Sequence, residues 1–323
     1  MDVKQIVEQI LHQHGNHIKQ VFFLACGGSL VDVYPAAYFL SHESRTISAV
    51  AQTAKEFVLC TPPTAGPNSL AVLCSHGGKT PEVIEAAKLA QKLGMSVVTF
   101  THNAEGIICQ LGHHNIVYGW GEETSIAQRC PVQALDLMNE LLHTSEQEYS
   151  LYTEMKAAIA EIDRITRQAM KLSREPARLF AKMYGQESMI YVLGSGASFA
   201  NAYGFSICSL MEMMWMNSAY IHSGEFFHGP FEVTGDDPVF LLLMNPGRSR
   251  GMDERVRRFL VAHAKKFAVI DSAQLGAEQF APSVADYFAP IMFYYLSCVY
   301  REALAEERGH CLDDRRYMWQ MPY

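Results

Sequence analysis

The chain has 323 residues, of which 49% are hydrophobic and 19% charged, proportions typical of an ordinary globular protein with room for two domains. Its formal net charge of −8 argues against a nucleic-acid-binding surface, because binding to a phosphate backbone needs clustered lysines and arginines. We interpret the one basic cluster, at residues 255–259, as the solvated face of a helix, and a local pocket for a small anionic substrate remains compatible with the composition.

The N-terminal residues predict an amphipathic helix and lack the continuous apolar run and cleavage site of a secretory leader. The longest apolar stretch near the C-terminus, residues 287–300, is too short to span a bilayer and is interrupted by Pro290. The eight cysteines form no C-x-x-C pair, and several lie in apolar segments, as buried thiols in a reducing compartment do. We therefore expect a cytoplasmic protein without membrane or nucleic-acid partners.

Short apolar runs of strand type alternate with helical patterns along the first half of the chain. The predicted strands cover residues 21–26, 46–50, 69–75, 96–101 and 115–119. The clearest helix covers residues 81–94, with Pro81 in its first turn and Gly94 at its C-terminal end. This alternation predicts an α/β fold with a parallel β-sheet sandwiched by helices.

The second half of the chain repeats this plan at a nearly constant offset. Four pairs of segments match, at offsets of 169, 169, 169 and 171 residues: 24–32 with 193–201, 53–57 with 222–226, 69–78 with 238–247, and 96–102 with 267–273. A constant offset of this kind indicates internal duplication. We therefore predict two tandem domains, over residues 1–150 and 151–300, followed by a C-terminal helix and tail over residues 301–323.

The stretch "CSHGGKTPEV" at residues 74–83 places a hydroxyl-bearing loop between a strand and a helix start. Free backbone N–H groups and the positive end of the helix dipole make such a start a ready site for an anion. Ser75 and Thr80 add hydroxyl donors to that loop. The stretch lacks the G-x-x-x-x-G-K-[ST] pattern of a triphosphate-binding loop, and a well-capped turn without a ligand is the alternative interpretation.

Two glycine-rich turns follow strands, at residues 25–32 and 193–201. The second begins a G-x-G pattern, but Phe199 stands where the third glycine of a dinucleotide fingerprint belongs, so we expect no nicotinamide cofactor. The serines of these turns are better suited to contact a phosphate or a sugar hydroxyl: Ser29, Ser195 and Ser198. The histidine-rich segments offer no complete set of zinc or iron ligands, and we expect no metal.

One carboxylate, Glu212, lies within the most methionine-rich segment of the chain, and His228 follows sixteen residues later in the loop "GEFFHGP". A carboxylate buried without a partner is costly, so Glu212 is either well paired or used in chemistry. A histidine in such a loop is suited to proton exchange. The alternatives are a structural acid satisfied by an arginine or a backbone N–H, and an exposed loop histidine without a catalytic role.

Together these segments resemble the sugar isomerase (SIS) domain family, and the chain resembles two tandem SIS domains over essentially its whole length. The stretches that carry the resemblance are "ACGGS", "AKEF", "SHGGKTPE", "GSGAS", "HSGEFFHGPFE" and "RRYMW". The chain is similar to the isomerase half of glucosamine-6-phosphate synthase, and more similar to the bacterial fructosamine-6-phosphate deglycases. This resemblance implies a homodimer, with sites near the junction of the two domains.

The resemblance also implies roles for individual residues. In the synthase family, an acid sixteen residues before the histidine of an HGP loop forms the catalytic pair with it, and Glu212 and His228 have that spacing. The family's phosphate loop has the form S-x-S-G-x-T, and here Gly77 replaces its middle serine. Gln320 stands where the synthase has a lysine used in ring opening, which speaks against the synthase reaction. The residues expected to contact the phosphate or the sugar are Gly28, Ser29, Ser75, Gly78, Thr80 and Ser195.

These implications predict a cofactor-independent deglycase that converts a fructosamine 6-phosphate and water to glucose 6-phosphate and a free amino acid. Glu212 is the expected base, and His228 is expected to assist ring opening. The acidic chain favours a cationic conjugate such as fructoselysine 6-phosphate. The alternatives are a sugar-phosphate aldose–ketose isomerase, an aminosugar-phosphate deaminase and a non-catalytic sugar-phosphate sensor.

Overall fold

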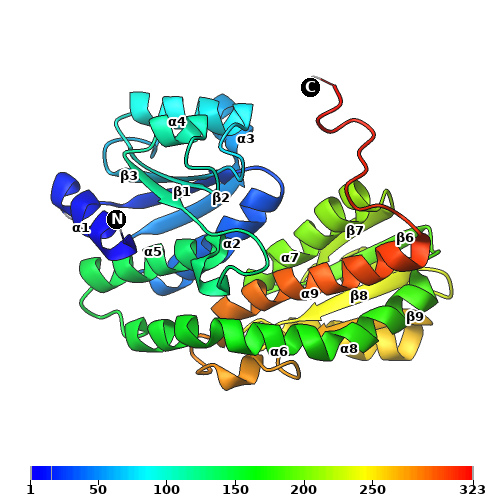
Figure 1. Cartoon of the computed structure of the whole chain (residues 1–323). Helices are drawn as coiled ribbons and strands as arrows, with labels where there is room; N and C mark the ends of the chain where they lie inside the picture. The colour runs from blue at the N-terminus through cyan, green and yellow to red at the C-terminus, as the bar shows by residue number, and fades with distance from the viewer. Residues whose placement is uncertain (1, 16, 322–323) are drawn as a thin grey trace. The chain divides into compact units, whose positions relative to one another are not determined.

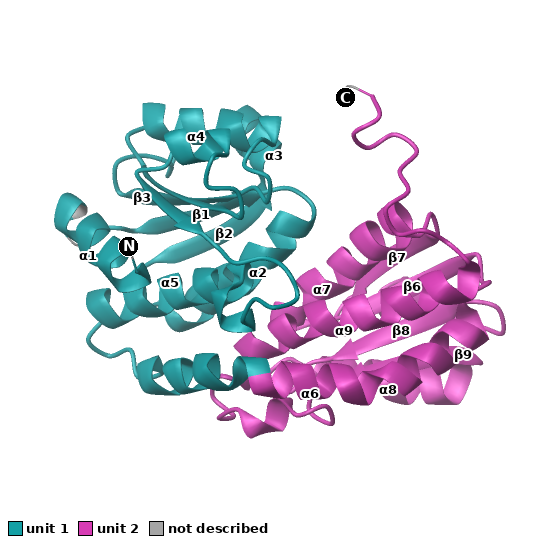
Figure 2. Cartoon of the chain, viewed as in Figure 1, with its two compact units in different colours: residues 1–163 teal, residues 164–323 magenta. Residues whose placement is uncertain are grey.

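The structure is a computed structural model that describes residues 2–15 and 17–321 (Figure 1). It divides into two compact units, residues 1–163 and 164–323, which Figure 2 colours separately. The boundary falls inside the long helix α6 (Tyr152–Tyr184), and each unit contains one parallel sheet. Within the described residues, no helix is both long and apolar enough to cross a membrane.

Unit 1 is built on a five-stranded parallel sheet with the strand order β2-β1-β3-β4-β5. Its strands are β1 (Gln20–Ala25), β2 (Ser48–Thr53), β3 (Ser69–Cys74), β4 (Ser96–Thr101) and β5 (His114–Val117). β3 and β4 are buried at every residue, because strands between two helix layers meet water on neither face. β2 begins two residues later than predicted, since Thr46 is bound through its N–H and hydroxyl to the Glu146 carboxylate instead of entering the strand.

The helices of unit 1 form two layers, one on each face of the sheet (Figure 1). One layer contains α1 (Val3–His14), α2 (Gly28–Glu43) and α5 (Cys130–Ser145), and the other contains α3 (Ala54–Leu59) and α4 (Pro81–Lys92). Short 3₁₀ turns, η1 (Ile107–Gln110) and η2 (Ile126–Gln128), lie between these elements. α4 starts at Pro81 as predicted and ends before Gly94, whose φ of +76° stops the helix.

Unit 2 repeats this architecture with one strand fewer. Its strands are β6 (Met189–Gly194), β7 (Asn217–His222), β8 (Val239–Met244) and β9 (Lys266–Asp271), in the order β7-β6-β8-β9. Its helices are α7 (Phe199–Gly204), the π-helix η4 (Phe205–Met213), α8 (Arg250–His263) and α9 (Ala285–Arg308), with 3₁₀ turns η3 (Gly196–Ser198), η5 (Pro230–Val233) and η6 (Ala277–Gln279).

The strand positions confirm the predicted duplication. β1 and β6 begin at residues 20 and 189, and β2 and β7 begin at residues 48 and 217, which is an offset of 169 in both cases. β3 and β8 begin at residues 69 and 239, and β4 and β9 at residues 96 and 266, an offset of 170. The α/β fold with two tandem parallel sheets is therefore as the sequence predicts.

Both sheets share one topological feature that determines where a ligand can bind. The first strand of each unit lies between the second and the third, so the connections leave it in opposite directions. The carboxyl ends of the two central strands then face a crevice at this switch point, where open parallel sheets bind their ligands. In unit 1 the two central strands are β1 and β3, and the loops that follow them carry the predicted phosphate ligands.

Candidate active site

The loop after β3 brings together the hydroxyls of two predicted phosphate ligands. Ser75 follows the last residue of β3, and Thr80 is the N-cap residue of α4. The Ser75 Oγ and Thr80 Oγ1 atoms lie 2.9 Å apart. The Thr80 side chain makes no capping hydrogen bond, so the first-turn N–H groups of α4 are not satisfied by their own cap. This is the arrangement expected of an anion site at a helix start.

Some of the backbone donors of this loop are open to a ligand. The Gly78 N–H donates to the Ser75 carbonyl at 3.0 Å and the Thr80 N–H to Ser75 Oγ at 3.4 Å. The N–H groups of residues 76, 77 and 79, in contrast, have no hydrogen-bond partner among the described residues. Among the residues that the structure describes, no carboxylate accepts a hydrogen bond from the N–H groups of residues 76–80. A phosphate at this position would lie at a helix N-terminus and could accept hydrogen bonds from two hydroxyls and from backbone amides. Hydrogen bonds from such donors to an ionised oxygen are among the stronger ones in proteins.

The shape of the loop depends on Gly78. Its φ is +70°, in the left-handed region that favours glycine. A Cβ atom on Gly78 would lie 2.7 Å from the Cα of Gly106, in the segment after β4. Both the backbone conformation and the close approach of the two chain segments therefore require glycine, and a contact between Gly78 and the substrate stays a prediction.

We expect Gly78→Ala to lower the free energy of unfolding by about 2 kcal/mol or more, because a left-handed conformation and steric overlap add together. Urea titration followed by circular dichroism measures this change. Gly77→Ala is the matched control, since its Cβ would meet nothing closer than the Lys79 side chain at 3.9 Å. Equal losses in the two variants would show that the contact with Gly106 does not constrain the loop.

The second predicted set of phosphate contacts begins α2. Gly28 is the first residue of this helix and Ser29 the second, and both are accessible to solvent. Because β1 and β3 are adjacent parallel strands, the loops that follow them lie at the same edge of the sheet. Within the described chain, the Ser29 hydroxyl has no hydrogen-bond partner. The fold thus brings the unit 1 candidates to one edge.

A cluster of imidazole and aromatic side chains borders the loop, and no sequence motif marks it. His76 Nδ1 lies 2.9 Å from Tyr118 Oη, and the His76 ring stacks on that of His102 with centroids 4.7 Å apart. Trp120 packs edge-on against His76, and Arg129 lies over Trp120. Burial, together with the charges of His102 and Arg129, lowers the pKa of His76. The only signal in the sequence was the position of this histidine within "SHGG".

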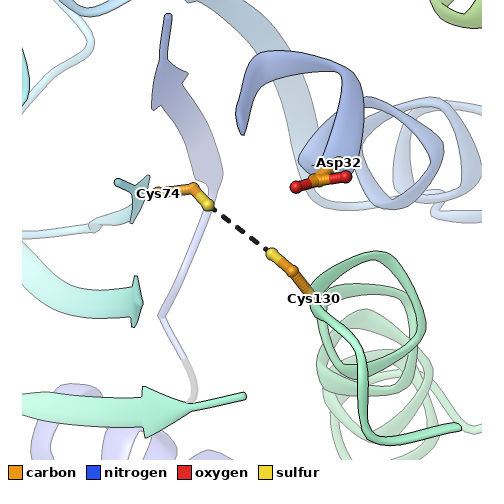
Figure 3. Close-up of side chains that lie close together, drawn as sticks. All are labelled: Asp32, Cys74 and Cys130. Carbon is orange, nitrogen blue, oxygen red and sulfur yellow. Dashed lines mark hydrogen bonds between the residues drawn. The ribbon is translucent and has the colours of Figure 1, made fainter. Parts of the chain in front are cut away.

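Three ionisable side chains meet next to the loop (Figure 3). Cys74 ends β3, Cys130 begins α5 and Asp32 lies in α2, and their sulfur and oxygen atoms all lie within 4.8 Å of one another. Burial raises the pKa of Asp32 to about 7, opposed by the charge of Arg129. Burial, reinforced by the neighbouring Cys74, holds the pKa of the Cys130 thiol well above its ordinary value. These three residues are 42 and 56 positions apart in the sequence, so no spacing motif marks them.

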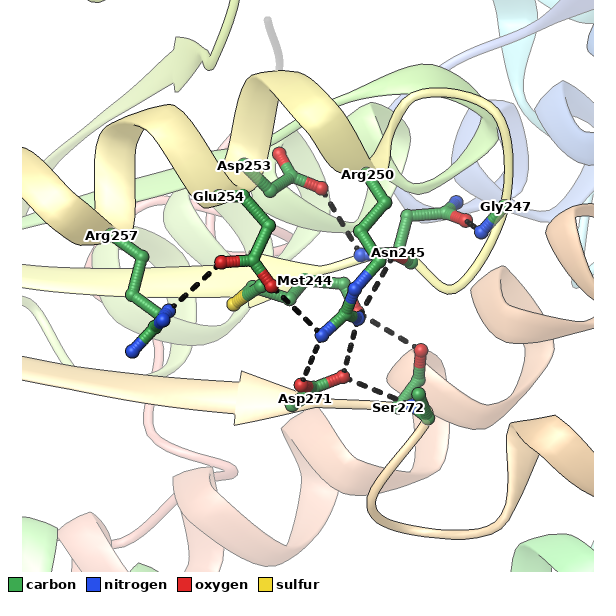
Figure 4. Close-up of polar contacts among 10 residues, drawn as sticks. Met244, Asn245, Gly247, Arg250, Asp253, Glu254, Arg257, Asp271 and Ser272 are labelled. Carbon is green, nitrogen blue, oxygen red and sulfur yellow. Dashed lines mark hydrogen bonds and ion pairs between the residues drawn. The ribbon is translucent and has the colours of Figure 1, made fainter.

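The corresponding loop of unit 2 is closed by carboxylates of its own chain. It follows β8, as the loop of Ser75 follows β3. The backbone N–H of Asn245 donates to Asp253 Oδ2 at 3.1 Å (Figure 4), and that of Arg248 donates to Asp286 Oδ2 at 3.0 Å. These carboxylates are 0% and 2% exposed. Donors that would receive an external anion are already satisfied, which leaves unit 1 as the half with an open anion loop.

Ser195, a predicted substrate contact, lies in this closed region of unit 2. It is fully buried, and its hydroxyl donates to the Ser249 carbonyl at 3.4 Å and hydrogen-bonds with Asp253. Ser198 is also fully buried and accepts a hydrogen bond from Asn245 Nδ2 at 2.9 Å. A substrate contact from either serine would have to replace an internal hydrogen bond. Ser75 of unit 1 is similar, since it is 1% exposed and hydrogen-bonded to Thr80, whereas the Ser29 hydroxyl has no hydrogen-bond partner among the described residues and is better placed to bind substrate.

An ion-pair network fixes the start of α8 beside this closed loop (Figure 4). Arg250 makes a two-pronged contact with the Asp271 carboxylate, at 2.9 and 2.8 Å, and lies 3.1 Å from Glu254. Burial raises the pKa of Asp253 to about 6, although hydrogen bonds from Ser223 and Asn245 and the charge of Arg250 act in the opposite direction. Asp253 therefore holds its proton in the folded protein at pH values where an exposed aspartate has lost it.

Through Asp253 we expect the free energy of unfolding to fall by on the order of 2–3 kcal/mol as the pH rises from about 4 to about 6. Across this window the folded state binds more protons than the unfolded state, whose carboxyl ionises near its ordinary pKa of 3.8. Asp253→Asn is neutral at every pH and removes this contribution, whereas Asp237→Asn, an exposed control, retains it. Parallel curves of stability against pH for wild type and Asp253→Asn would contradict the raised pKa.

Glu212 lies near the end of η4 and is paired with an arginine. Arg315 Nη2 is 3.0 Å from Glu212 Oε1, and the Glu212 side chain is 22% exposed. The surrounding segment is less buried than its composition suggests, because Met211 and Trp215 are 41% and 37% exposed. Glu212 is therefore a paired acid that solvent can reach, as one of the two alternatives anticipates. Its position on a π-helix is also notable, since such turns occur frequently at functional sites.

The C-terminal tail holds Arg315 against this segment. Arg315 is 6% exposed and donates through Nη1 to the carbonyl oxygens of Leu312 and Asp314. The Arg316 guanidinium lies 4.1 Å from the centre of the Trp215 ring. The "RRYMW" stretch at residues 315–319 thus has a physical role, because its two arginines fasten the tail to the segment that carries the candidate base.

His228 lies on an exposed turn whose base is fixed by aromatic packing. Phe226 is fully buried and packs edge-on against Phe259 of α8, with ring centroids 5.7 Å apart. The His228 N–H donates to the Glu225 carbonyl at 2.9 Å, and Gly229 follows with a φ of +131°. The His228 side chain is exposed. A rigid turn therefore presents this imidazole to the surroundings of unit 2.

Glu212 and His228 are not in contact in the part of the chain that the structure describes, where neither a hydrogen bond nor an ion pair joins them. Their action as a catalytic pair stays a prediction. Gln320 is exposed, and its backbone N–H donates to the Tyr317 carbonyl at 2.9 Å.

Comparisons with known proteins place the chain in a family. The SIS domain model matches residues 16–135. Fructosamine deglycase FrlB of Bacillus subtilis is 36% identical, over 96% of this chain and 94% of its own length. Fructoselysine 6-phosphate deglycase of Escherichia coli is 27% identical, over 98% of this chain and 89% of its own length.

A solved structure supports the same placement. A protein from Salmonella typhimurium, described as a candidate phosphosugar isomerase, superposes with a TM-score of 0.95 at 35% sequence identity, and the match covers 100% of this chain and 98% of that one. The chain belongs to the SIS domain family, within its fructosamine deglycase group, and is an enzyme of the sugar-phosphate isomerase type.

Proposed function

We propose that this enzyme is a deglycase that converts a fructosamine 6-phosphate and water to glucose 6-phosphate and a free amino acid. The observation that carries the proposal is the open anion loop of unit 1, with the Ser75 and Thr80 hydroxyls 2.9 Å apart at the start of α4. This loop is suited to bind the phosphate of a phosphorylated sugar. The nearly full-length similarity to a fructosamine deglycase favours removal of an amine from that sugar over simple isomerisation.

The first step of the proposed reaction moves a proton between two adjacent carbons. The substrate carries a secondary amine on C1 and a ketone at C2. Glu212 removes a proton from C1, which gives an enaminol, and returns a proton to C2, which gives the C1 iminium of glucose 6-phosphate. The Arg315 guanidinium, 3.0 Å from Glu212, holds the carboxylate in place.

The second step releases the amino acid. Water adds to the C1 iminium, the carbon–nitrogen bond breaks, and the products are the aldehyde of glucose 6-phosphate and a free amine. The C2 carbonyl accepts the electron pair when C1 loses its proton, and the nitrogen takes the bonding pair when the carbon–nitrogen bond breaks, so the substrate supplies both acceptors itself. His228 assists ring opening and exchanges protons with the sugar oxygens. Ser29, at the start of α2, and Ser75 and Thr80, in the loop after β3, hold the phosphate and so limit the movement of C1 and C2 during the reaction.

For the substrate we favour a cationic conjugate, fructoselysine 6-phosphate. A curated relative is named for that substrate, and an acidic chain is compatible with a cationic lysine moiety next to the anionic phosphate. The SIS fold also hosts other chemistry, so an aldose–ketose isomerase, an aminosugar-phosphate deaminase and a sugar-phosphate sensor are the competing assignments.

The decisive experiment incubates the purified protein with fructoselysine 6-phosphate or with its aspartate analogue. A coupled dehydrogenase reports glucose 6-phosphate, and a parallel assay reports the free amino acid. Stoichiometric release of both products is expected, with fructoselysine 6-phosphate turned over faster. If neither product forms while a sugar phosphate still raises the melting temperature, the deglycase assignment is wrong and an isomerase or a sensor remains.

We further propose that the enzyme acts as a homodimer. The support is that His228 is exposed and has no contact with Glu212 among the described residues of its own chain. A second copy of the chain that supplied the histidine would complete the catalytic pair. Sedimentation velocity at micromolar concentration is expected to show a species of twice the 36.2 kDa chain mass.

A further inference from the structure

We propose that Asp32, Cys74 and Cys130 form a binding site for a thiophilic divalent cation, with zinc as the ion of best fit. The proposal is independent of the deglycase reaction, since none of the three residues has a role in the proposed chemistry. All eight cysteines of the chain are free thiols, and these two are the only ones that share a cluster of potential metal ligands in the described part of the chain.

The donor set is the one that zinc takes in proteins. Two cysteine sulfurs and one carboxylate oxygen converge from three separate elements, as Figure 3 shows: the end of β3, the start of α5 and the second turn of α2. Zinc binds thiolate and carboxylate ligands and accepts a water molecule as the fourth. Magnesium and calcium prefer sites made of oxygen alone, so the two sulfurs argue against them.

The spacing of the donor atoms also suits one ion. The two sulfurs lie 3.5 Å apart, close to the separation of about 3.8 Å that two thiolates have in a tetrahedral zinc site. A sulfur and an oxygen bound to the same zinc ion can be at most about 4.4 Å apart. The Asp32 oxygen lies within 4.8 Å of both sulfurs, whereas a tetrahedral site separates a sulfur and an oxygen by about 3.5 Å, so the carboxylate must move by up to about 1 Å to bind the same ion.

Among the described residues, no hydrogen bond occupies the Asp32 carboxylate, although the charge of Arg129 acts on it. Cys74 and Cys130 are 0% and 1% exposed, whereas Asp32 keeps partial exposure. An ion can therefore arrive past the carboxylate and keep a water ligand on that side, while the sulfurs are shielded from solvent.

Charge balance supports an ion rather than a set of bare thiolates. Zinc binding would release one proton from each thiol, so that two thiolates, one carboxylate and the ion leave a net charge of −1. Arg129 adjoins Cys130 in sequence and interacts with Asp32 electrostatically, which offsets that charge. Without an ion, burial favours the protonated thiol of Cys130, so metal binding must displace that proton and metal affinity must rise with pH.

The consequence of binding would be local to the phosphate loop. Cys74 directly precedes Ser75, and Asp32 lies three residues after Ser29. An ion bound by Cys74, Cys130 and Asp32 would join the ends of β3 and α5 to α2, and so restrict the two loops that carry the predicted phosphate ligands. The ion has a structural role in this proposal, because it lies on no path for the substrate's protons.

The test uses the full chain, reduced and stripped of metal, with cobalt(II) as a spectroscopic substitute for zinc. We expect one equivalent of cobalt to give a thiolate-to-metal charge-transfer band and tetrahedral d–d bands, and one equivalent of zinc to abolish both. One equivalent of zinc is also expected to raise the melting temperature by about 3–5 °C. Absence of the charge-transfer band at stoichiometric cobalt overturns the proposal.

Variants separate this site from adventitious binding. Cys130→Ser and Cys74→Ser are expected to lose the charge-transfer band, and Cys60→Ser, which removes an exposed thiol, to retain it. Asp32→Asn leaves both buried thiols in place and is expected to weaken cobalt binding by about 10-fold or more. Circular dichroism of each metal-free variant checks that it is folded. A band that persists in Cys130→Ser, or an unchanged affinity in Asp32→Asn, overturns the assignment of these ligands.

Discussion

Glu212→Gln is expected to lower kcat by about 10²–10⁴-fold, with the fold and the binding of sugar phosphate retained. The amide keeps the shape of the side chain and can still contact Arg315, but it cannot take the proton from C1 of the substrate. Steady-state release of glucose 6-phosphate measures the loss. Titration calorimetry with glucose 6-phosphate, whose phosphate the unit 1 loop would hold, checks that binding survives.

Glu232→Gln is the control for this prediction, because Glu232 is an exposed acid of the same unit. It is expected to keep the wild-type rate. If Glu212→Gln also turned over at that rate, Glu212 would be a structural partner of Arg315 and the base would lie elsewhere. A loss of activity accompanied by a large fall in melting temperature would indicate the same structural role.

His228→Ala is expected to lower kcat by about 10²-fold or more, because proton exchange at the sugar oxygens loses its donor. The side chain is exposed on a turn held by Phe226, so its removal should leave the melting temperature unchanged. Sugar-phosphate affinity should also be unchanged, since the proposed phosphate ligands lie in unit 1. His263→Ala, a histidine at the C-terminal end of α8, is the control and is expected to remain active. Wild-type turnover by His228→Ala would remove His228 from the mechanism.

Mixing the two inactive variants tests whether one site draws on two chains. In a dimer that joins Glu212→Gln to His228→Ala, one of the two sites regains both wild-type groups if the histidine comes from the partner copy. Random mixing is then expected to recover about a quarter of wild-type activity. If Glu212 and His228 of the same chain act together, every site in the mixed dimer lacks one of them, and activity should not return.

The sequence predicts the architecture well because the fold follows from periodic features that each segment carries. Apolar runs of strand length, alternating with amphipathic helices, indicate a parallel sheet wherever they occur, and the repeat at offsets near 169 residues indicates two such sheets. The start of α4 can also be predicted from local sequence, because proline suits the first turn of a helix in any protein and Pro81 occupies that position. The spacing of Ser75 and Thr80 around that helix start is sufficient to predict that their hydroxyls lie close together.

Other features of the site depend on residues that are distant in sequence. The ion pair between Glu212 and Arg315 joins residues about one hundred positions apart, and nothing in the methionine-rich segment indicates which arginine would approach it. The closure of the unit 2 loop by Asp253 and Asp286 is similar, since a glycine-containing loop after a strand has the same appearance whether its donors are open or occupied. Long-range contacts of this kind are set by packing, and periodicity does not encode them.

At the closed loop of unit 2, carboxylates attached to the chain compete with freely diffusing anions for the same backbone amides. The carboxylates of Asp253 and Asp286 are attached to the chain whose amides they bind, so their effective concentration at the loop is set by the fold and not by the cell. Inorganic phosphate at millimolar levels would not displace them, whereas the open loop of unit 1 would remain subject to it. Inhibition by free phosphate should therefore follow a single-site curve in each chain, although the molecule descends from two copies of the same domain.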